Sequence, residues 1–456
     1  MSTKTEHMNI NLEQNTKNFL KLAKGATSNI INLVGSKIGY SEGEAVVEII
    51  IYIIIALVIL IFIVWTYNLT QKPTQECSNL DDIYNNNSVH IQPIGVRNVF
   101  NTFSQQGLNT VTNNGFPYKS KFQIFDVPPN GPGRIFSYYV KTAYNCCSPG
   151  GFKNSFVNMC ALQHAIKLGA RCLDFEIYSE NNKPVVATSI ESQSLYNSFH
   201  IKETFNSLDL VDVLWYINLY AIGEDVQTSD GNSATNASDP LFLHLRIMTN
   251  ELQTINLIAK YLGEIFQDKL LGSAYGNDNY GNSFGQYYLI QFCNKCIVMV
   301  EYNSLNSAHI TNSNLFPLIN ILTNTSKNKL FRQQKLASEH KADLTLFNKN
   351  YMTMVLPNLT PGSDNFDPRP SMQLGCQFVA MNFQNFDENL EVYFKIFDEL
   401  QFSFVLKQCK LRNTPSHTLL AEIPKEKRSS ACGSTATTSN GSVSYTQIIP
   451  ITKMEP

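Results

Sequence analysis

The longest apolar run of the chain is IIIYIIIALVILIFIVWTY, from Ile49 to Tyr67. It carries no charge, and at about 1.5 Å per residue it gives about 28 Å of helix, enough to cross the hydrocarbon core of a bilayer. Trp65 and Tyr67 lie at one end, where amphipathic aromatic side chains favour the membrane interface. The pattern predicts a transmembrane helix over residues 46–67. A buried core helix would need a polar face, and a cleavable signal peptide would lie closer to the N-terminus.

Beyond about Tyr138, short apolar runs alternate with longer amphipathic segments. The strand-like runs RCLDFEIY, KPVVAT, PLFLHLRI and KCIVMVEY are separated by the helix-like TFNSLDLVDVLWYINLYAI and by a helical period over Glu251–Phe266. This alternation predicts a parallel α/β architecture. The remaining divisions are a polar N-terminal segment at 1–45, a juxtamembrane stalk or loop at 68–117, an α/β half at 118–302, a linker at 303–350, a second half at 351–410 and a disordered tail at 411–456.

The charges along the chain bear on two questions: whether it binds nucleic acid, and which side of the membrane each end of the predicted helix faces. A formal net charge of −2 with 16% charged residues leaves no basic field for nucleic acid, so we expect no nucleic-acid partner. Lysines are concentrated before the helix, which predicts a cytosolic N-terminus and a lumenal or exterior C-terminal part. All ten cysteines follow the helix, which permits disulfides on that side. The lysines before the helix are Lys4, Lys17, Lys21, Lys24 and Lys37, against Lys72 shortly after it.

Two separated segments resemble the eukaryotic phosphoinositide-specific phospholipase C family. The first-half matches are YYVKTAYN (Tyr138–Asn145), LGARCLDFEIY (Leu168–Tyr178), KPVVATS, DPLFLHLRI and YLGEIFQDKLL (Tyr261–Leu271). The second-half matches are SDNFDPRPSMQLGCQFVAMNFQ (Ser363–Gln384) and FSFVLK (Phe402–Lys407). The resemblance implies a distorted (β/α)8 TIM barrel, with an X-box-like half at 118–302 and a Y-box-like half at 351–410, preceded by the single transmembrane helix.

The family's chemistry, by this resemblance, needs two histidines as general base and acid. Tyr144 and Thr188 occupy those two positions here. A tyrosine side chain, with a reference pKa of about 10, is a poor base at neutral pH, and threonine cannot replace an imidazole. We therefore expect both positions to be non-functional in catalysis.

The family also holds a calcium ion, and its site is only partly present. Asn145, Asp174 and Glu176 match metal-ligand positions, and the two carboxylates share one strand face. Arg246 replaces a further ligand glutamate, and a guanidinium pairs with carboxylates instead of ligating calcium. Two interpretations follow: a vestigial calcium site, used only if it is still competent, or a buried salt bridge that holds the strands in register. Otherwise no cofactor is expected.

Two further positions match the family's headgroup contacts. Phe366 stands where the family stacks an aromatic ring on inositol, and Ser338 matches a headgroup-binding serine. Lysine positions of the family align with Met299 and Glu301, and its second-box arginine aligns near Pro361. His244 shares a strand face with Arg246 and could substitute as a catalyst, but its deeper position favours a barrel-core histidine.

Three functional hypotheses remain. The first is a membrane-anchored, catalytically inactive pseudoenzyme that binds a phospholipid headgroup or a protein partner. The second is an active phosphoinositide phospholipase C, or another phosphoric diester hydrolase, with a diverged site using Asp174, Glu176 or His244. The third is a structural membrane protein of a virus particle, suggested by the Asn- and Ile-rich composition. Membrane contact through residues 49–67 is common to all three.

Overall fold

A computed structural model describes residues 21, 42–86, 134–190, 201–223, 234–276, 283–303, 306–398, 402–413, 436–438 and 441–443. The chain divides into two units, Met1–Lys72 and Pro73–Pro456. Helix α2 (Glu42–Asn86) forms the described part of the first unit, apart from Lys21, and continues into the second. Of the described helices, one is long and apolar enough to cross a membrane, over Ile49–Tyr84.

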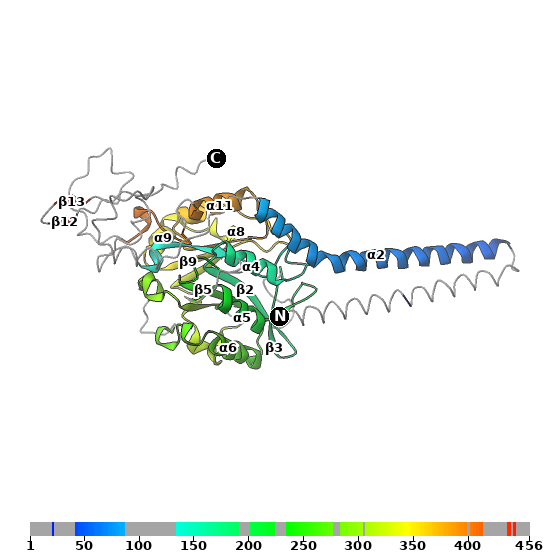
Figure 1. Cartoon of the computed structure of the whole chain (residues 1–456), viewed down its shortest axis with the longest axis horizontal. Helices are drawn as coiled ribbons and strands as arrows, with labels where there is room; N and C mark the ends of the chain where they lie inside the picture. Colours follow the sequence, from blue (N-terminus) through cyan, green and yellow to red (C-terminus); the bar gives the residue numbers. More distant parts are fainter. Residues whose placement is uncertain are drawn as a thin grey trace. The chain divides into compact units, whose positions relative to one another are not determined.

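The second unit is built on eight parallel strands (Figure 1). They are β1 (Tyr138–Ala143), β2 (Cys172–Glu180), β5 (Leu241–Ile247), β6 (Cys296–Glu301), β7 (Ile321–Thr323), β8 (Asn328–Arg332), β9 (Met352–Leu356) and β10 (Phe378–Met381). Their pairing order is β7-β6-β5-β2-β1-β10-β9-β8. The two end strands approach each other where the Asn328 side chain donates to the Leu322 carbonyl at 3.2 Å. The sheet is therefore a nearly closed barrel, and the predicted TIM-type fold is confirmed.

Short strands and helices surround this barrel. The further strands are β3 (Lys183–Ala187), β4 (Leu208–Asp209), β11 (Phe404–Leu406), and the separate pair β12 (Ala436–Thr438) and β13 (Gly441–Val443). The α-helices are α4 (Met159–Lys167), α5 (Leu210–Tyr220), α6 (Leu252–Phe266), α7 (Ser307–Thr311), α8 (Gln333–Leu336), α9 (Lys341–Phe347), α10 (Arg369–Gln373) and α11 (Glu388–Asp398). The 3-10 turns are Ile135–Ser137, Gln267–Lys269, Ser273–Tyr275, Phe284–Gln286, Leu289–Phe292, Phe316–Leu318 and Cys409–Leu411.

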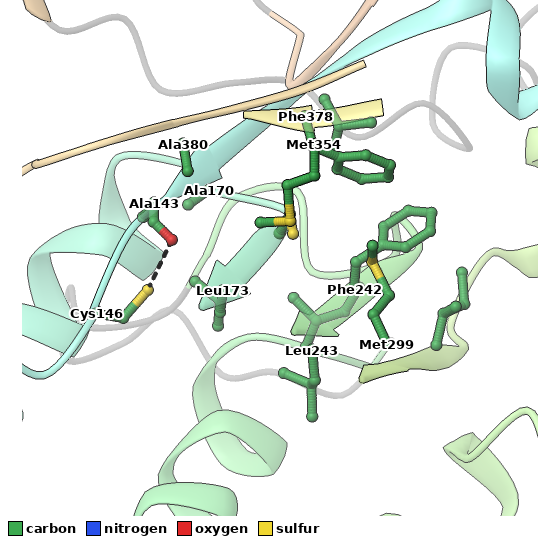
Figure 2. Close-up of a cluster of buried hydrophobic side chains, with 14 of the residues drawn as sticks. Ala143, Cys146, Ala170, Leu173, Phe242, Leu243, Met299, Met354, Phe378 and Ala380 are labelled. Carbon is green, nitrogen blue, oxygen red and sulfur yellow. Dashed lines mark hydrogen bonds between the residues drawn. The ribbon is translucent and has the colours of Figure 1, made fainter. Parts of the chain in front are cut away.

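The layer of side chains nearest the N-terminal ends of the barrel strands is apolar. Phe242 of β5 and Phe378 of β10 meet edge to face, with ring centroids 5.3 Å apart. Figure 2 shows their rings gathered with the side chains of Met299 and Met354. Because side chains alternate along a strand, residues two and four positions beyond Phe242 share its face. The interior therefore continues from Phe242 to His244 and Arg246, changing from apolar to charged toward the C-terminal ends of the strands.

Two predicted boundaries were wrong. The helix predicted to end at Tyr67 continues to Asn86, so residues 68–86 are helical instead of a stalk or loop. A polar composition hid this continuation, because those residues lack the apolar signal that marked the span. Residues 87–117 lie outside the described part of the chain.

The predicted linker at 303–350 contains two barrel strands, β7 and β8, together with α7, α8 and α9. β7 is only three residues long, too short to show a strand period in the sequence. The two strands extend the barrel at its β6 and β9 edges through parallel pairing. The expected disordered tail at 411–456 and most of the polar segment at 1–45 lie outside the described residues.

Candidate functional site

Five polar side chains meet inside the barrel near the C-terminal ends of β1, β2 and β5. The parallel register of β2 and β5 places Asp174 beside His244 and Glu176 beside Arg246. Asn145 lies two residues beyond the end of β1, in a left-handed conformation with a φ of 42° that asparagine tolerates. All five are at most 2% exposed. The set therefore forms one buried polar layer at the end of the barrel where chemistry takes place in this class of fold.

The Arg246 guanidinium is the centre of this layer. Its Nε donates to Asp174 Oδ1 at 3.0 Å and its Nη2 to Asp174 Oδ2 at 2.8 Å, a bidentate pair. Its Nη1 donates to Glu176 Oε1 at 2.6 Å, and its Nη2 also donates to Asn145 Oδ1 at 2.7 Å. The Tyr144 ring lies over the guanidinium, 4.7 Å from its carbon to the ring centroid. One cation thus binds all three residues that matched metal-ligand positions.

The remaining acceptor positions of the two carboxylates are also used. Glu176 Oε2 accepts from the Tyr178 hydroxyl at 2.7 Å and from the Ser189 backbone N–H at 2.9 Å. Asp174 Oδ2 accepts from the Asn145 backbone N–H at 3.1 Å. Because each buried anion is so fully hydrogen-bonded, the cost of removing it from water is largely offset.

His244 lies in register with Asp174, two residues before Arg246 on β5, and is fully buried. Its Nδ1 is 2.7 Å from Asp174 Oδ1 and its Nε2 is 3.0 Å from the Thr323 hydroxyl. Both ring nitrogens are therefore engaged within the barrel. This placement matches the interpretation of His244 as a barrel-core residue and leaves it no face toward a substrate.

Charge pairing shapes the acid–base behaviour of the layer. Burial alone would raise the pKa of Asp174, but the Arg246 guanidinium and the His244 hydrogen bond outweigh burial and hold it well below its usual range. For Arg246, burial would lower the pKa, but Asp174, Tyr144 and Glu176 raise it well above its usual value. Asp174 and Arg246 are therefore a stable ion pair throughout the ordinary pH range.

Because the pKa of Asp174 is lower in the folded protein than in the unfolded chain, the free energy of unfolding of the barrel should depend on pH in the acidic range. Its stabilising contribution is complete above the unfolded pKa of about 4 and is lost as pH falls through the lower folded pKa. We expect the free energy of unfolding to fall more steeply below about pH 4 in the native chain than in the Asp174→Asn variant. Urea unfolding at a series of pH values measures both slopes. Equal slopes would show that Asp174 is not the group responsible.

The side chains at the two positions that match the family's histidines are buried and contact Phe152. Tyr144 is 2% exposed, its hydroxyl accepts from Arg332 Nη1 at 2.9 Å, and its ring packs edge to face on Phe152 at 5.4 Å. Thr188 is also 2% exposed and donates to the Phe152 carbonyl at 2.9 Å. Both side chains thus contact Phe152, and each already has a hydrogen-bond partner.

The predicted headgroup contacts lie elsewhere. Ser338 is exposed, and its hydroxyl donates to the Lys335 carbonyl at 2.7 Å, next to α8. Phe366 is half-buried and packs against the main hydrophobic core. Met299 is buried in the barrel and Glu301 ends β6. The structure therefore joins Asn145, Asp174, Glu176 and Arg246 in one hydrogen-bonded layer, whereas the Ser338 hydroxyl bonds to Lys335 and the Phe366 ring packs on the hydrophobic core.

A pocket beside this layer includes a residue that the sequence did not suggest. The pocket is small, with a cavity volume of about 10 Å³, roughly the space of one water molecule, and it lies next to Asn145 and Tyr144. Leu80 of α2 is one of its walls and is 1% exposed. Cys77, Leu80 and Tyr84 recur at a helical spacing of three and four residues, which would have predicted a buried helix face in the segment taken for a stalk. The full lining is Leu80, Ala143, Tyr144, Asn145, Cys146, Ser148, Ala161, His164, Ala165, Phe383 and Gln384.

Similarity to known proteins includes one family match in sequence and several distant likenesses in structure. Residues 296–409 match the family model described as phosphatidylinositol-specific phospholipase C, Y domain. No curated protein matches the chain in sequence. L. pealei PLC21 and S. officinalis PLC21 are similar crystal structures, each at 16% identity and a TM-score of 0.48, covering 61% of this chain and 38% of their own. A calcium-dependent phosphoinositol-specific phospholipase C from Pseudomonas sp. is similar at 10% identity and a TM-score of 0.35, covering 62% and 99%.

The family match covers the second part of a nearly closed parallel barrel that has a polar layer at the C-terminal ends of its strands. Residues 296–409 match the Y domain of phosphatidylinositol-specific phospholipase C, which supports a phosphoinositide-specific phospholipase C-type protein. The resemblance predicted from the sequence is thereby confirmed. The Y-domain match begins at Cys296, well before the predicted boundary at Tyr351, in agreement with the two strands found in the supposed linker.

Proposed function

We propose that this protein is a membrane-anchored, catalytically inactive phospholipase C-like protein whose barrel serves as a binding or structural module for a lipid headgroup or a protein partner. One observation carries the proposal: the Arg246 guanidinium occupies the space between Asn145, Asp174 and Glu176. In the family these positions face a calcium ion. A side-chain cation with a fixed hydrogen-bond pattern has taken over the charge balance of that layer.

Calcium does not fit this donor set. Asn145 Oδ1, both oxygens of Asp174 and Glu176 Oε1 all accept hydrogen bonds from Arg246. Calcium requires six to eight oxygen ligands at 2.3–2.6 Å, and those oxygens cannot approach it while they hold a guanidinium. The divalent charge would also be repelled by the arginine.

Acid–base chemistry is also missing from the two expected positions. Tyr144 and Thr188 have no imidazole, and both are held in buried hydrogen bonds. Loss of one general acid or base typically costs about 10²- to 10⁴-fold in rate, which corresponds to about 3–5 kcal/mol. Two such losses on one site support the absence of useful phosphodiester cleavage.

Membrane anchoring rests on the first unit. Its large apolar side chains from Ile49 to Tyr67 are mostly exposed, with Ile61 at 67% and Tyr67 at 60%. A continuous apolar helix surface of this length is stable in lipid and unfavourable in water. We therefore propose that this segment lies in a lipid bilayer.

Orientation is supported by a disulfide in the second unit, between Cys77 and Cys160. Disulfides persist in oxidising compartments and are rare in the cytosol. Together with the lysines before the span, this favours a barrel on the lumenal or exterior side, away from a cytosolic leaflet. Alkylation of free thiols before cell lysis tests the orientation: a fully reduced Cys77–Cys160 pair in cells would contradict it.

The test of the proposed function combines hydrolysis with calcium binding. We expect the full chain in lipid nanodiscs to leave phosphatidylinositol and its bisphosphate uncleaved, and calcium to leave its melting temperature unchanged. Arg246→Glu returns a carboxylate to the layer, so calcium should raise the melting temperature of that variant only. Calcium-dependent release of inositol phosphate by the native chain would overturn the proposal and favour the diverged phosphodiesterase.

A further inference from the structure

The last part of α2, residues 73–86, is here called the neck and belongs to the same unit as the barrel. Its inward side chains recur with helical spacing at Glu76, Cys77, Leu80 and Tyr84. Among residues 73–84, Leu80 is the one side chain that is fully buried. The neck therefore packs through one narrow stripe.

This stripe lies on the C-terminal ends of β1 and β10, where barrels of this class carry their sites. Leu80 shares a pocket with Tyr144 and Asn145, just after β1. The Tyr84 hydroxyl donates to the Phe383 carbonyl, just after β10. Because Asn145 lines this pocket and also accepts a hydrogen bond from Arg246, the neck packs beside the buried polar layer.

A second group of contacts joins the neck to α4 and the loop before it. Asp81 Oδ1 lies 2.9 Å from His164 Nε2, and the Tyr84 ring stacks on His164 with centroids 5.2 Å apart. Glu76 Oε1 accepts from the Ser155 hydroxyl at 3.0 Å. The Asp81 side chain is 63% exposed, so its ion pair is screened by water. The Asp81–His164 pair therefore holds the neck only weakly.

The covalent contact is the Cys77–Cys160 disulfide, which joins the neck to α4 across a sequence separation of 83 residues. Both cysteines are half-buried, so the disulfide lies within reach of an attacking thiolate. The other described free cysteines that lie in the barrel core, Cys146 among them, are buried. The half-buried position of this disulfide distinguishes it from a crosslink inside the core.

We propose that the neck is a redox-latched cover of the barrel mouth. The disulfide holds it over the ends of β1 and β10, and reduction by a dithiol frees it to lift from the pocket beside Asn145. In that step the S–S bond breaks, Cys77 and Cys160 become thiols, and the dithiol supplies two electrons and two protons as it becomes a disulfide. This device goes beyond the proposed function, because it would control access whether or not the barrel is catalytic.

Cys146 is a built-in reporter for this movement. It lines the covered pocket, is 4% exposed, and its thiol donates to the Ala143 carbonyl at 3.3 Å, a contact drawn in Figure 2. Cys376 lies at the other end of the barrel, before β10, and is fully buried. Lifting the neck uncovers Cys146 and leaves Cys376 packed, whereas general unfolding exposes both.

The experiment treats the full chain in lipid nanodiscs with dithiothreitol, alkylates it with N-ethylmaleimide, and locates the label by peptide mass spectrometry. We expect alkylation of Cys146 to become about tenfold faster after reduction, with no change at Cys376. Unchanged protection of Cys146 would overturn the proposal, and so would equal exposure of Cys146 and Cys376.

Two variants test separately the Cys77–Cys160 disulfide and the packing of the neck over the pocket. Cys77→Ser/Cys160→Ser should label Cys146 without dithiothreitol. Leu80→Glu, which keeps the disulfide but places a charge in the pocket, should raise Cys146 labelling while Cys77 and Cys160 remain oxidised. If the double variant fails to fold, reduction of the folded native chain still decides the matter. Protection of Cys146 in both folded variants would contradict the proposed cover.

Discussion

Replacing Arg246 with methionine is expected to lower the free energy of unfolding by about 3–5 kcal/mol. The guanidinium is the direct partner of both Asp174 and Glu176, and all three side chains are at most 2% exposed. Methionine would fill much of the volume but leave two buried carboxylates without their cation. Urea unfolding of the full chain in mild detergent, followed by circular dichroism, measures the loss.

Two controls bracket this result. Arg369→Met removes an arginine whose pair with Asp367 is partly exposed, so its effect should stay within about 0.5 kcal/mol. The triple variant Asp174→Asn/Glu176→Gln/Arg246→Met removes the whole charge set and should recover part of the lost stability, because no uncompensated anion remains. A loss below about 1 kcal/mol for Arg246→Met would mean that the layer is not electrostatically coupled as its geometry indicates.

Removing the disulfide with Cys77→Ser/Cys160→Ser is expected to lower the free energy of unfolding by about 3–5 kcal/mol. The crosslink closes a loop with a sequence separation of 83 residues, and a long closed loop restricts the unfolded chain strongly. Urea unfolding of the variant against the oxidised native chain gives the difference.

The matched control is the native chain unfolded in dithiothreitol, which should lose the same amount of stability as the double variant. Dithiothreitol should leave the stability of the double variant itself unchanged, since its disulfide is already absent. Equal stability of the oxidised native chain and the double variant would indicate that the neck contributes through noncovalent contacts alone.

Part of the site could be predicted because strand geometry is local. Side chains alternate along a strand, so Asp174 and Glu176 had to share one face, as did His244 and Arg246. The substitution of Arg246 at a ligand position then favoured a salt bridge between these strands. The structure adds the exact partition of the guanidinium among Asp174, Glu176 and Asn145.

Other features could not be predicted from a local pattern. The strand β7 is three residues long, and its identity as a strand depends on pairing with β6. The neck looked like a polar stalk, because its one buried stripe is too narrow to raise the hydrophobic signal of the segment. His244 could be placed on a face but not paired, because Thr323 lies 79 residues further along the chain.

The sequence by itself determined the apolar span, the parallel α/β class, the phospholipase C resemblance and the loss of histidine at positions 144 and 188, since each depends on residue identity or on a short period. Only the tertiary structure decided that the barrel continues through residues 321–332, that Arg246 binds all three positions predicted as metal ligands, and that the neck lies over the ends of β1 and β10. These depend on contacts between residues far apart in sequence, whose free energy exists only once the strands are assembled.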